Sequence, residues 1–387
     1  MPYVVTVNLQ IMTIAIYIHA LGVGGAERVA VHLANHWTSL GFQVVMITNA
    51  KLSSYPYELN EAVVHECLGV HGSSHNLAKA IFSNFNRIVL LRSVIKKHKI
   101  EKIVSFSFTA NVVLAIARIG ISGLYAIGSE RNYPPREVKS KLWNNLRRYS
   151  YRALDVVTVQ TEKTKKWVES NTSAKKVLTI PNPVVYPLPI SHSKESPDFP
   201  KVSPDLLDGR RFVLAVGRME TQKQFGHLLE AFALLAGDFV GWDLVIVGDG
   251  YRRVELEEQV LTLGIETRVC FPGKVGNIAS WYARADVFVL CSQFEGFPNV
   301  LLEAMAHGLP VSSYDCDTGP ADLIINNVNG LLVDPDNIEL LSESIRRLIV
   351  EDSFREFLAK NATDVRDKFS ASTVFAKWDS LLELNSR

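Results

Sequence analysis

Two carboxylates in one short stretch are the residues of this chain best suited to ligand chemistry. Glu295 and Glu303 have seven residues between them and bracket a turn, because an apolar run leads into a loop and a helix is expected from about Asn299 to His307. Ligands of open α/β sheets bind beyond the carboxyl ends of strands, beside helix N-termini. The backbone donors facing an anion there would be those of Asn299, Val300 and Leu301. Ionised carboxylates accept hydrogen bonds from hydroxyls, so the stretch predicts a ligand with both phosphates and sugar hydroxyls, a nucleotide sugar.

The same stretch resembles the retaining glycosyltransferases of family GT4, which have the two-domain GT-B fold. The resemblance is carried by EGFPNVLLEA, followed by GLPV and CDTGPADLI, and Glu295 and Glu303 match the family's Glu-x7-Glu signature. It implies that Glu303 accepts hydrogen bonds from the ribose of the donor. It also implies that Glu295, with the backbone of Gly296 and Phe297, holds the transferred sugar. The alternative is an ordinary strand–helix unit in which Glu303 is a solvated surface carboxylate.

Two cations follow a further expected strand, RFVLAVG. Arg218 and Lys223 lie in GRMETQKQ, which resembles the family segment whose two cations hold the donor's diphosphate. A departing nucleoside diphosphate gains negative charge as the glycosidic bond breaks, so fixed cations stabilise the transition state more than the ground state. The resemblance also places Gly248 in the loop near the nucleoside and Val275 against the base. The alternative for the two cations is a pair of surface residues beside a helix start.

A glycine-rich turn lies near the start of the chain. Thr13 to His19 reads as a buried strand and about Ala26 to Leu40 as a helix, with the glycines between them. A Rossmann-like domain has its phosphate loop at this point. GGAER is common here in the family, which implies that Gly24 and Gly25 lie near the acceptor and the donor diphosphate. Arg131, after a later strand, is a candidate contact for an acceptor phosphate or, alternatively, a plain surface arginine.

The chain departs from the family after the expected strand IVSFS. Many family members carry a histidine in the following loop that faces the donor sugar. This chain has no histidine there and offers Ser105, Ser107, Thr109 and Asn111. The role of that histidine is therefore unassigned.

No metal or other cofactor is expected. D-x-D binds metal in another glycosyltransferase fold, and 315–317 and 334–336 match it literally, but three-residue matches are common by chance. Asp336 is expected to cap the helix that follows. His32 and His36 share a helical face without an evident carboxylate or cysteine partner, which favours a satisfied histidine pair. Arg218 and Lys223 would do what a divalent ion does elsewhere.

The net charge of +1 hides an uneven distribution along the chain. Residues 1–185 contain 22 Lys and Arg and 10 Asp and Glu, a charge of +12, and the remainder carries −11. Such a split predicts that the first half meets an anionic surface. An anionic membrane leaflet is favoured over nucleic acid, because no interleaved aromatic–basic RNA motif is evident.

Cysteine usage and apolar runs indicate a cytoplasmic protein without a membrane span. The four cysteines form no C-x-x-C pair, which is typical of reduced, structural thiols, and no secretory signal is evident. The apolar stretch 103–129 is interrupted by serines and glycines. It is therefore expected to be a strand, a helix and a second strand rather than a membrane helix.

The segment 136–152, REVKSKLWNNLRRYSYR, mixes basic and apolar residues. Leu142, Leu146 and Tyr149 fall at i, i+4 and i+7, which would give an apolar stripe beside a basic face, as in an interfacial helix. The alternative is an amphipathic helix whose stripe packs on the domain core. At a membrane, Trp143 would lie at the interface with the basic residues Arg136, Lys139, Lys141, Arg147, Arg148 and Arg152.

At 387 residues the chain exceeds the usual size of a single core, so two domains are expected. Residues 1–185 read as an N-terminal, acceptor-binding Rossmann-like domain. Prolines concentrate between 181 and 204, which predicts a stiff linker over 186–210. Residues 211–371 read as a nucleotide-sugar-binding Rossmann-like domain, and 372–387 as a helix that crosses back to the first domain. The fold class is α/β, of GT-B type, with an interdomain cleft.

These features together predict a retaining glycosyltransferase at the inner face of the cytoplasmic membrane. It would move a sugar from a UDP-sugar to a polyprenyl-diphosphate-linked saccharide in surface-polysaccharide assembly, an acceptor class implied by the resemblance. Retention without an evident nucleophile fits front-face attack, with the leaving phosphate accepting the acceptor's proton; Glu295 as nucleophile is the alternative. The rival functions are a nucleotide-sugar epimerase and a non-catalytic nucleotide-binding regulatory protein. Met12 is a candidate start, because residues 1–11 add nothing to the first βαβ unit.

Overall fold

The computed structural model describes residues 12–22, 24–50, 57–70, 77–137, 139–188 and 209–384. Residues 1–11, on which the candidate start at Met12 depends, and most of the expected linker lie outside this range. The described residues form two compact units. One contains residues up to Ile180 together with those from Phe375, and the other contains Pro181–Val374.

The first unit is built on a seven-stranded parallel sheet with the order β3-β2-β1-β4-β5-β6-β7. Its strands are β1 (Thr13–Ile18), β2 (Gln43–Thr48), β3 (Val64–Cys67), β4 (Lys102–Phe106), β5 (Tyr125–Ser129), β6 (Val156–Val159) and β7 (Val177–Thr179). Its helices are α1 (Gly25–Ser39), α2 (Leu77–Lys97), α3 (Phe108–Arg118), α4 (Lys141–Ser150) and α5 (Glu162–Asn171), with 3-10 turns η1 (Pro134–Arg136) and η2 (Tyr151–Ala153). Within 103–129, β4, α3 and β5 confirm the expected strand, helix and strand.

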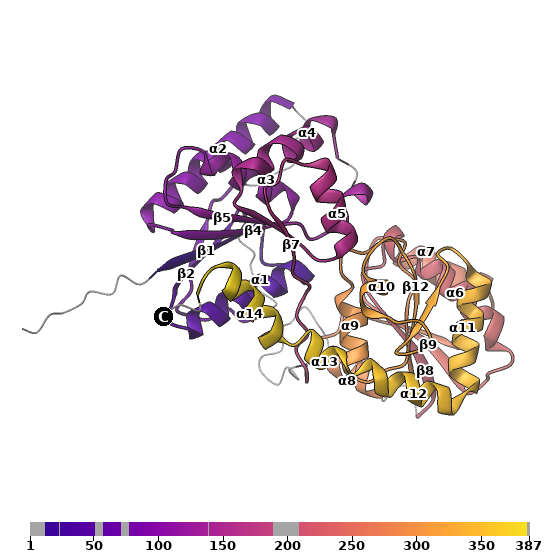
Figure 1. Ribbon diagram of the computed structural model, residues 1–387. Helices are drawn as coiled ribbons and strands as arrows, with labels where there is room; N and C mark the ends of the chain where they lie inside the picture. Colours follow the sequence, from indigo (N-terminus) through magenta and orange to yellow (C-terminus); the bar gives the residue numbers. More distant parts are fainter. Residues whose placement is uncertain are drawn as a thin grey trace, which may run out of the picture. The chain divides into compact units, whose positions relative to one another are not determined.

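Helices cover both faces of this sheet. Helices α2, α3 and α4 lie on one side, and α1 and α14 (Ala371–Leu381) on the other (Figure 1). All six residues of β1 are buried, which explains why TIAIYI is continuously apolar rather than alternating. Asp379 of α14 accepts hydrogen bonds from Trp37 Nε1 and His36 Nε2 of α1, each at 2.9 Å. The C-terminal helix is thus bonded directly to the first helix of the unit.

The second unit repeats the plan with a six-stranded parallel sheet of order β10-β9-β8-β11-β12-β13. Its strands are β8 (Arg211–Val216), β9 (Trp242–Val247), β10 (Val269–Gly273), β11 (Val287–Leu290), β12 (Val311–Tyr314) and β13 (Leu331–Val333). Its helices are α6 (Phe225–Ala236), α7 (Arg253–Thr262), α8 (Ile278–Arg284), α9 (Asn299–Ala306), α10 (Pro320–Leu323), α11 (Ile338–Val350), α12 (Asp352–Ala362) and α13 (Val365–Lys368), with η4 (Thr221–Lys223). Apolar clusters line both faces of the sheet.

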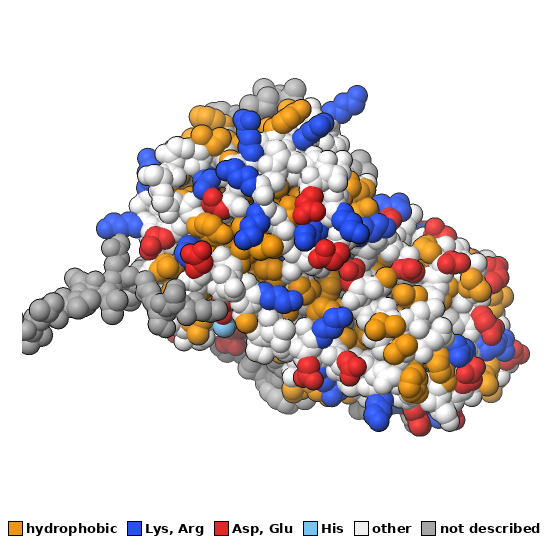
Figure 2. Space-filling model, in the orientation of Figure 1, with side chains coloured by type: hydrophobic (Ala, Val, Ile, Leu, Met, Phe, Trp, Pro, Cys, Tyr) orange, Lys and Arg blue, Asp and Glu red, His pale blue; other side chains and the backbone are white. Residues whose placement is uncertain are grey.

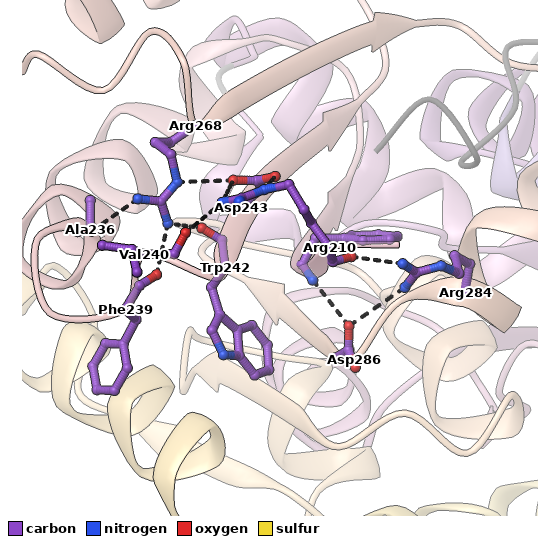
Figure 3. A network of polar contacts seen from close by, with 10 residues as sticks. Arg210, Ala236, Phe239, Val240, Trp242, Asp243, Arg268, Arg284 and Asp286 are labelled. Carbon is purple, nitrogen blue, oxygen red and sulfur yellow. Dashed lines mark hydrogen bonds and ion pairs between the residues drawn. The ribbon is translucent and has the colours of Figure 1, made fainter. Parts of the chain in front are cut away.

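An arginine–aspartate network fastens the amino ends of β8, β9 and β11 (Figure 3). Asp243, at the start of β9, is 5% exposed and accepts from Arg210 Nε at 2.6 Å and Arg268 Nε at 3.0 Å. Arg284 Nη2 donates to the Arg210 carbonyl at 2.7 Å, and Asp286 accepts from the Phe212 N–H at 3.0 Å. The network holds the sheet at the edge opposite to the carboxyl ends of its strands.

Both sheets have the doubly wound order in which the chain starts in the middle and then reverses direction. The switch point lies between β1 and β4 in the first unit and between β8 and β11 in the second. Ligands of such sheets bind outside the carboxyl ends of the strands at this point. Among the described residues, no helix is long and apolar enough to cross a membrane.

Candidate functional site

The switch point of the second sheet brings Lys223 and Glu295 together. Lys223 ends the turn η4 after β8, and Glu295 lies in the loop after β11. Lys223 Nζ lies 2.6 Å from Glu295 Oε1, and the two side chains are 14% and 10% exposed. The two residues are 72 positions apart in the chain. The geometry thus joins a cation suited to phosphate and a carboxylate suited to hydroxyls at one point.

Backbone and side-chain bonds between the two loops fix this pair. Gln222 Nε2 donates to the Phe294 carbonyl at 2.6 Å, and the Gln293 N–H donates to the Gln222 carbonyl at 2.8 Å. Cys291 Sγ donates to the Lys223 carbonyl at 3.1 Å. The Thr318 hydroxyl donates to the Glu295 carbonyl. Gln222 and Thr318 lie within the segments GRMETQKQ and CDTGPADLI, but neither was assigned a role from the sequence, because their role depends on a contact between distant loops.

Arg218 occupies a different environment from Lys223. Its side chain is 67% exposed, and Nη1 bonds Glu220 Oε1 at 3.0 Å. The structure therefore holds Lys223 in a defined position and leaves Arg218 largely in solvent.

Gly248 follows β9 and lies against the loop after β8. Its φ is 138°, and an added Cβ would lie far inside contact distance of the Gly217 carbonyl oxygen. A side chain at this position would push apart the loops that carry Lys223 and the GDG turn. The expected nucleoside loop therefore needs glycine here for close backbone approach.

Helix α9 begins at Asn299 next to Glu295, as expected from the sequence, with Pro298 as its N-cap. Asn299 Oδ1 accepts a hydrogen bond from Asn182 Nδ2 at 2.6 Å. The expectation that the Leu301 N–H faces a ligand is wrong, because it donates to the Pro298 carbonyl at 3.1 Å. Gly296 and Val300 are partly buried, and the Phe297 ring packs against Phe369 with centroids 5.8 Å apart. Of the three N–H groups expected to face an anionic ligand, those of Asn299 and Val300 therefore remain candidates.

Glu303 is buried in α9, with 5% exposure. Its Oε2 accepts a hydrogen bond from the Tyr282 hydroxyl at 3.0 Å. The alternative of a solvated surface carboxylate is therefore wrong. Val275, in the loop between β10 and α8, is partly buried, and its side chain packs against the apolar core.

The first unit places Gly24 and Arg131 at the carboxyl edge of its own sheet. Gly24 is the N-cap of α1 and Gly25 its first residue, and an added Cβ at Gly24 would collide with the Glu27 carboxylate. Arg131 follows β5 and is 8% exposed, with its guanidinium 5.1 Å from the Phe106 ring centroid. Burial lowers the pKa of Arg131 to about 9, and the Glu27 carboxylate opposes this shift. The alternative of a plain surface arginine is wrong.

Arg147 is not part of a solvated basic face. It is 2% exposed, with Nε 3.1 Å from Glu130 Oε1 and Nη2 on Glu137 Oε2. Its guanidinium stacks on the Phe108 ring at 3.9 Å. A charged side chain enters the core here because two carboxylates neutralise it. The expectation that Arg147 belongs to a membrane-facing cluster is therefore wrong.

The three residues of the expected apolar stripe of α4 do not share one environment. Leu142 and Tyr149 are 53% and 58% exposed, whereas Leu146 and Trp143 pack on the core. Trp143 is half-buried and meets Phe108 edge-on at 5.5 Å, so part of its ring belongs to the domain core, as in the alternative given for this helix. Lys141, Arg148 and Arg152 are exposed. The exposed face of the helix therefore still carries both apolar and basic residues.

The sequence features that resembled metal motifs have other partners. Asn337, not Asp336, caps α11 by accepting from the Leu340 N–H at 2.8 Å, and Asp336 accepts from Gln224 Nε2 at 2.6 Å. His36 has a carboxylate partner after all, Asp379, which comes from a helix 343 residues further along. Burial and the nearby Arg28 lower the pKa of His32 to about 4. In the part of the chain that the structure describes, no group of three or more His, Cys, Asp or Glu side chains could hold a metal ion.

The two doubly wound units are the architecture of the GT-B fold, and the solved structures that the chain matches are GT-B glycosyltransferases. Sucrose-phosphate synthase from Thermosynechococcus elongatus matches with a TM-score of 0.78 at 19% identity, covering 96% of this chain and 98% of that one. HepE from Anabaena, in complex with UDP, matches with a TM-score of 0.75 at 19% identity, covering 96% of this chain and 100% of that one. The predicted fold class is confirmed.

Sequence comparison narrows the class to a family. The model for glycosyltransferase family 4 matches residues 23–185, and the model for group 1 glycosyl transferases matches residues 200–365. A Campylobacter jejuni protein is 31% identical over 372 residues, covering 96% of this chain and 98% of its own. It is a GalNAc-α-(1→4)-GalNAc-α-(1→3)-diNAcBac-PP-undecaprenol α-1,4-N-acetyl-D-galactosaminyltransferase. The chain therefore belongs to the family 4, group 1 glycosyltransferases, as its motifs indicated.

A second relative from the same bacterium also covers nearly the whole chain. It is 27% identical over 371 residues, covering 92% of this chain and 94% of its own. Its name is N-acetylgalactosamine-N,N′-diacetylbacillosaminyl-diphospho-undecaprenol 4-α-N-acetylgalactosaminyltransferase.

Proposed function

We propose that the protein transfers a sugar, with retention of configuration, from a UDP-sugar to a polyprenyl-diphosphate-linked saccharide. The observation that carries the proposal is the Lys223–Glu295 pair, 2.6 Å apart at the switch point of the second sheet. A nucleotide sugar is the ligand class that needs a cation and a hydroxyl acceptor side by side, because its diphosphate adjoins its sugar. When the donor binds, Lys223 would turn to the diphosphate and Glu295 would accept from sugar hydroxyls.

The reaction needs charge stabilisation at the leaving group. The bond from the sugar's anomeric carbon to the diphosphate breaks, and its electron pair stays on the phosphate oxygen. The acceptor hydroxyl attacks the same face of the sugar and passes its proton to that oxygen. Lys223 stabilises the growing negative charge on the phosphate, and the solvent-exposed guanidinium of Arg218 is the second cation. Glu295 as a nucleophile is the alternative to this front-face attack.

The acceptor proposal rests on the relatives and on the edge of the first sheet. The two Campylobacter jejuni relatives are named for undecaprenol-diphosphate-linked acceptors. In this chain the N-terminus of α1 and the buried Arg131 are suited to an acceptor phosphate. Gly24 and Gly25 would let the phosphate approach the backbone closely.

One assay with four arms tests this function. Purified protein is incubated with a panel of nucleotide sugars, with and without a synthetic polyprenyl-diphosphate saccharide, and each is repeated with excess EDTA. We expect UDP release that depends on the acceptor and persists in EDTA, since the proposal assigns Lys223 the role that a metal has elsewhere. Isomerisation of the donor sugar in the absence of acceptor would instead support an epimerase. Nucleotide binding without any turnover would support a regulatory protein. Loss in EDTA that Mn²⁺ or Mg²⁺ restores would overturn the metal-independent mechanism.

We propose further that the protein acts on the inner face of the cytoplasmic membrane as a peripheral protein. A polyprenyl carrier must stay in the bilayer, so the enzyme has to approach its surface. Figure 2 shows Lys and Arg side chains spread over the visible face of the first unit among hydrophobic ones. On α4 and just after it, the exposed residues Lys141, Leu142, Arg148, Tyr149 and Arg152 combine cations with apolar side chains. This composition suits an anionic leaflet.

Changing Lys141, Arg148 and Arg152 together to Glu is expected to weaken binding to anionic liposomes by about 100-fold or more. Each basic residue near an anionic leaflet contributes about 1 kcal/mol, and acidic replacements add repulsion. Binding of the unmodified protein should fall steeply as salt rises. Liposome flotation measures both effects. Arg147 is left unchanged, because its partners are Glu130 and Glu137.

The matched control changes the exposed Lys96, Lys99 and Lys176 to Glu, which alters the net charge equally elsewhere on the first unit. The control should retain most of its binding, and both variants should keep activity on a short water-soluble acceptor. Equal loss in both variants would show that net charge rather than the α4 face determines binding. Retained binding in the α4 variant would contradict the assignment of this face.

A further inference from the structure

We infer that Tyr282 positions Glu303 for the ribose of the nucleotide, so that this tyrosine determines the preference for a ribonucleotide although it has no place in the motif. The inference rests on the proposed function and on the role that the family resemblance implies for Glu303, which is to accept hydrogen bonds from the ribose hydroxyls. Tyr282 lies on α8 and is 1% exposed. Its hydroxyl donates to Glu303 Oε2 at 3.0 Å, and the Val300 carbonyl lies 3.4 Å from the same hydroxyl.

Two neighbouring rings hold the tyrosine in place. The His307 ring stacks on it with centroids 5.1 Å apart and an interplanar angle of 29°. Phe288 of β11 packs at 6.1 Å and 53°. His307 Nδ1 lies 2.8 Å from the Glu303 carbonyl, which is an acceptor, so this nitrogen carries the proton. The ring that holds Tyr282 is thus bonded to the same residue that Tyr282 orients.

The location of α8 gives this contact a functional meaning. The helix starts at Ile278, directly after the loop that contains Val275 and is assigned to the base. Glu303, assigned to the ribose, lies on α9. Tyr282 therefore connects the element beside the base with the carboxylate beside the ribose. In a nucleoside the base and the ribose are covalently joined, so the protein elements that bind them must be held at a fixed separation.

A fixed carboxylate is what recognition of a vicinal diol requires. A carboxylate has roughly four acceptor positions, so the bond from Tyr282 is compatible with bonds from the 2′ and 3′ hydroxyls. Without the tyrosine hydroxyl, the buried Glu303 side chain would lose a donor and could rotate away from the diol. Interactions of this kind with a bound group are equal in the ground and transition states. Their loss changes KM and leaves kcat unaltered.

The test compares UDP with 2′,3′-dideoxy-UDP by calorimetry in the unmodified protein and in Tyr282→Phe. The unmodified protein should prefer UDP, and Tyr282→Phe should weaken UDP binding by about 10-fold, the range for a hydrogen bond to a charged group. Binding of the dideoxy nucleotide should be unchanged, so the preference shrinks. In turnover assays, KM for the donor should rise with kcat unaltered. Tyr186→Phe is the matched control. The Tyr186 ring also contacts the His307 ring, with centroids 5.2 Å apart, but Tyr186 is 43% exposed and lies outside the contact between Tyr282 and Glu303.

Several results would separate the inference from the proposed function. No UDP binding by the unmodified protein would count against the donor proposal itself. Equal loss of UDP and dideoxy-UDP in Tyr282→Phe, or no loss of either, would overturn the inference and leave the donor proposal standing. Glu303→Gln provides a test that does not depend on folding of the tyrosine variant. It should lose the ribose preference by itself, and a Glu303→Gln protein that keeps the preference would overturn the inference.

Discussion

Lys223→Ala should lower kcat by ~10²–10³ while the protein folds normally, the range seen when a single donor to a developing charge is removed. Lys223 Nζ is held 2.6 Å from Glu295 Oε1 and is 14% exposed, so its position before the donor binds is defined. Once Lys223 has turned from Glu295 to the bound diphosphate, its charge stabilises the departing diphosphate as the bond breaks. The measurement is acceptor-dependent UDP release under saturating donor, with circular dichroism as the folding check.

Arg218→Ala is the matched comparison. Its side chain is 67% exposed, and screening by solvent reduces the value of its charge, so a smaller loss of kcat is expected. Lys223→Arg should recover part of the activity lost in Lys223→Ala, because the charge is kept while the shape changes. A Lys223→Ala protein with nearly normal kcat would contradict the diphosphate assignment. A larger loss of kcat in Arg218→Ala than in Lys223→Ala would show that Arg218 makes the principal contact with the diphosphate.

Arg147→Met should lower the free energy of unfolding by about 3–5 kcal/mol, the range for removing one partner of a buried ion pair. Arg147 neutralises Glu130, which is 1% exposed, and Glu137. The Tyr151 hydroxyl also donates to Glu130, so the network holds α4 and η2 against the end of β5. Methionine keeps much of the volume and none of the charge. Urea unfolding of the two proteins measures the difference.

The pH dependence of this effect has a definite sign. Burial raises the pKa of Glu130 to about 7, and the Arg147 guanidinium opposes that shift. A carboxyl group with a raised pKa contributes stability that is present below its unfolded pKa and is lost as pH rises through the folded value. Without Arg147 the pKa of Glu130 in the folded protein rises further, so more stability is lost as the pH increases. The destabilisation by Arg147→Met should therefore be larger at pH 8 than at pH 5.

Arg148→Met is the control for this prediction. Arg148 is the next residue on α4 and is exposed, so its replacement should change the free energy of unfolding by less than about 0.5 kcal/mol at either pH. An Arg147→Met protein that is as stable as the Arg148→Met protein would show that the three charged groups do not act as a network.

The sequence by itself determined the class of fold and the segments that carry the chemistry. Apolar runs such as TIAIYI and DVFVL are buried strands because parallel strands are covered on both faces. The helix expected after Glu295 begins at Asn299 as predicted, since Pro298 ends the loop and apolar residues follow at helical spacing. These features depend on local propensity and periodicity, and both can be read from neighbouring residues. The motifs around Lys223 and Glu303 identified the family because they too consist of neighbouring residues.

Only the tertiary structure decided which of these residues meet. Lys223 and Glu295 are in contact because the reversal of strand order places the loops after β8 and β11 side by side, and strand order leaves no mark on a single sequence. Helical spacing suggested that Arg147 is solvated, but its two carboxylate partners lie in the loop after β5. Asp379 reaches His36 from a helix at the other end of the chain. Polar side chains are buried or exposed according to their partners. The sequence does not show which residues those partners are, because the parallel sheet brings separate loops together through long crossovers.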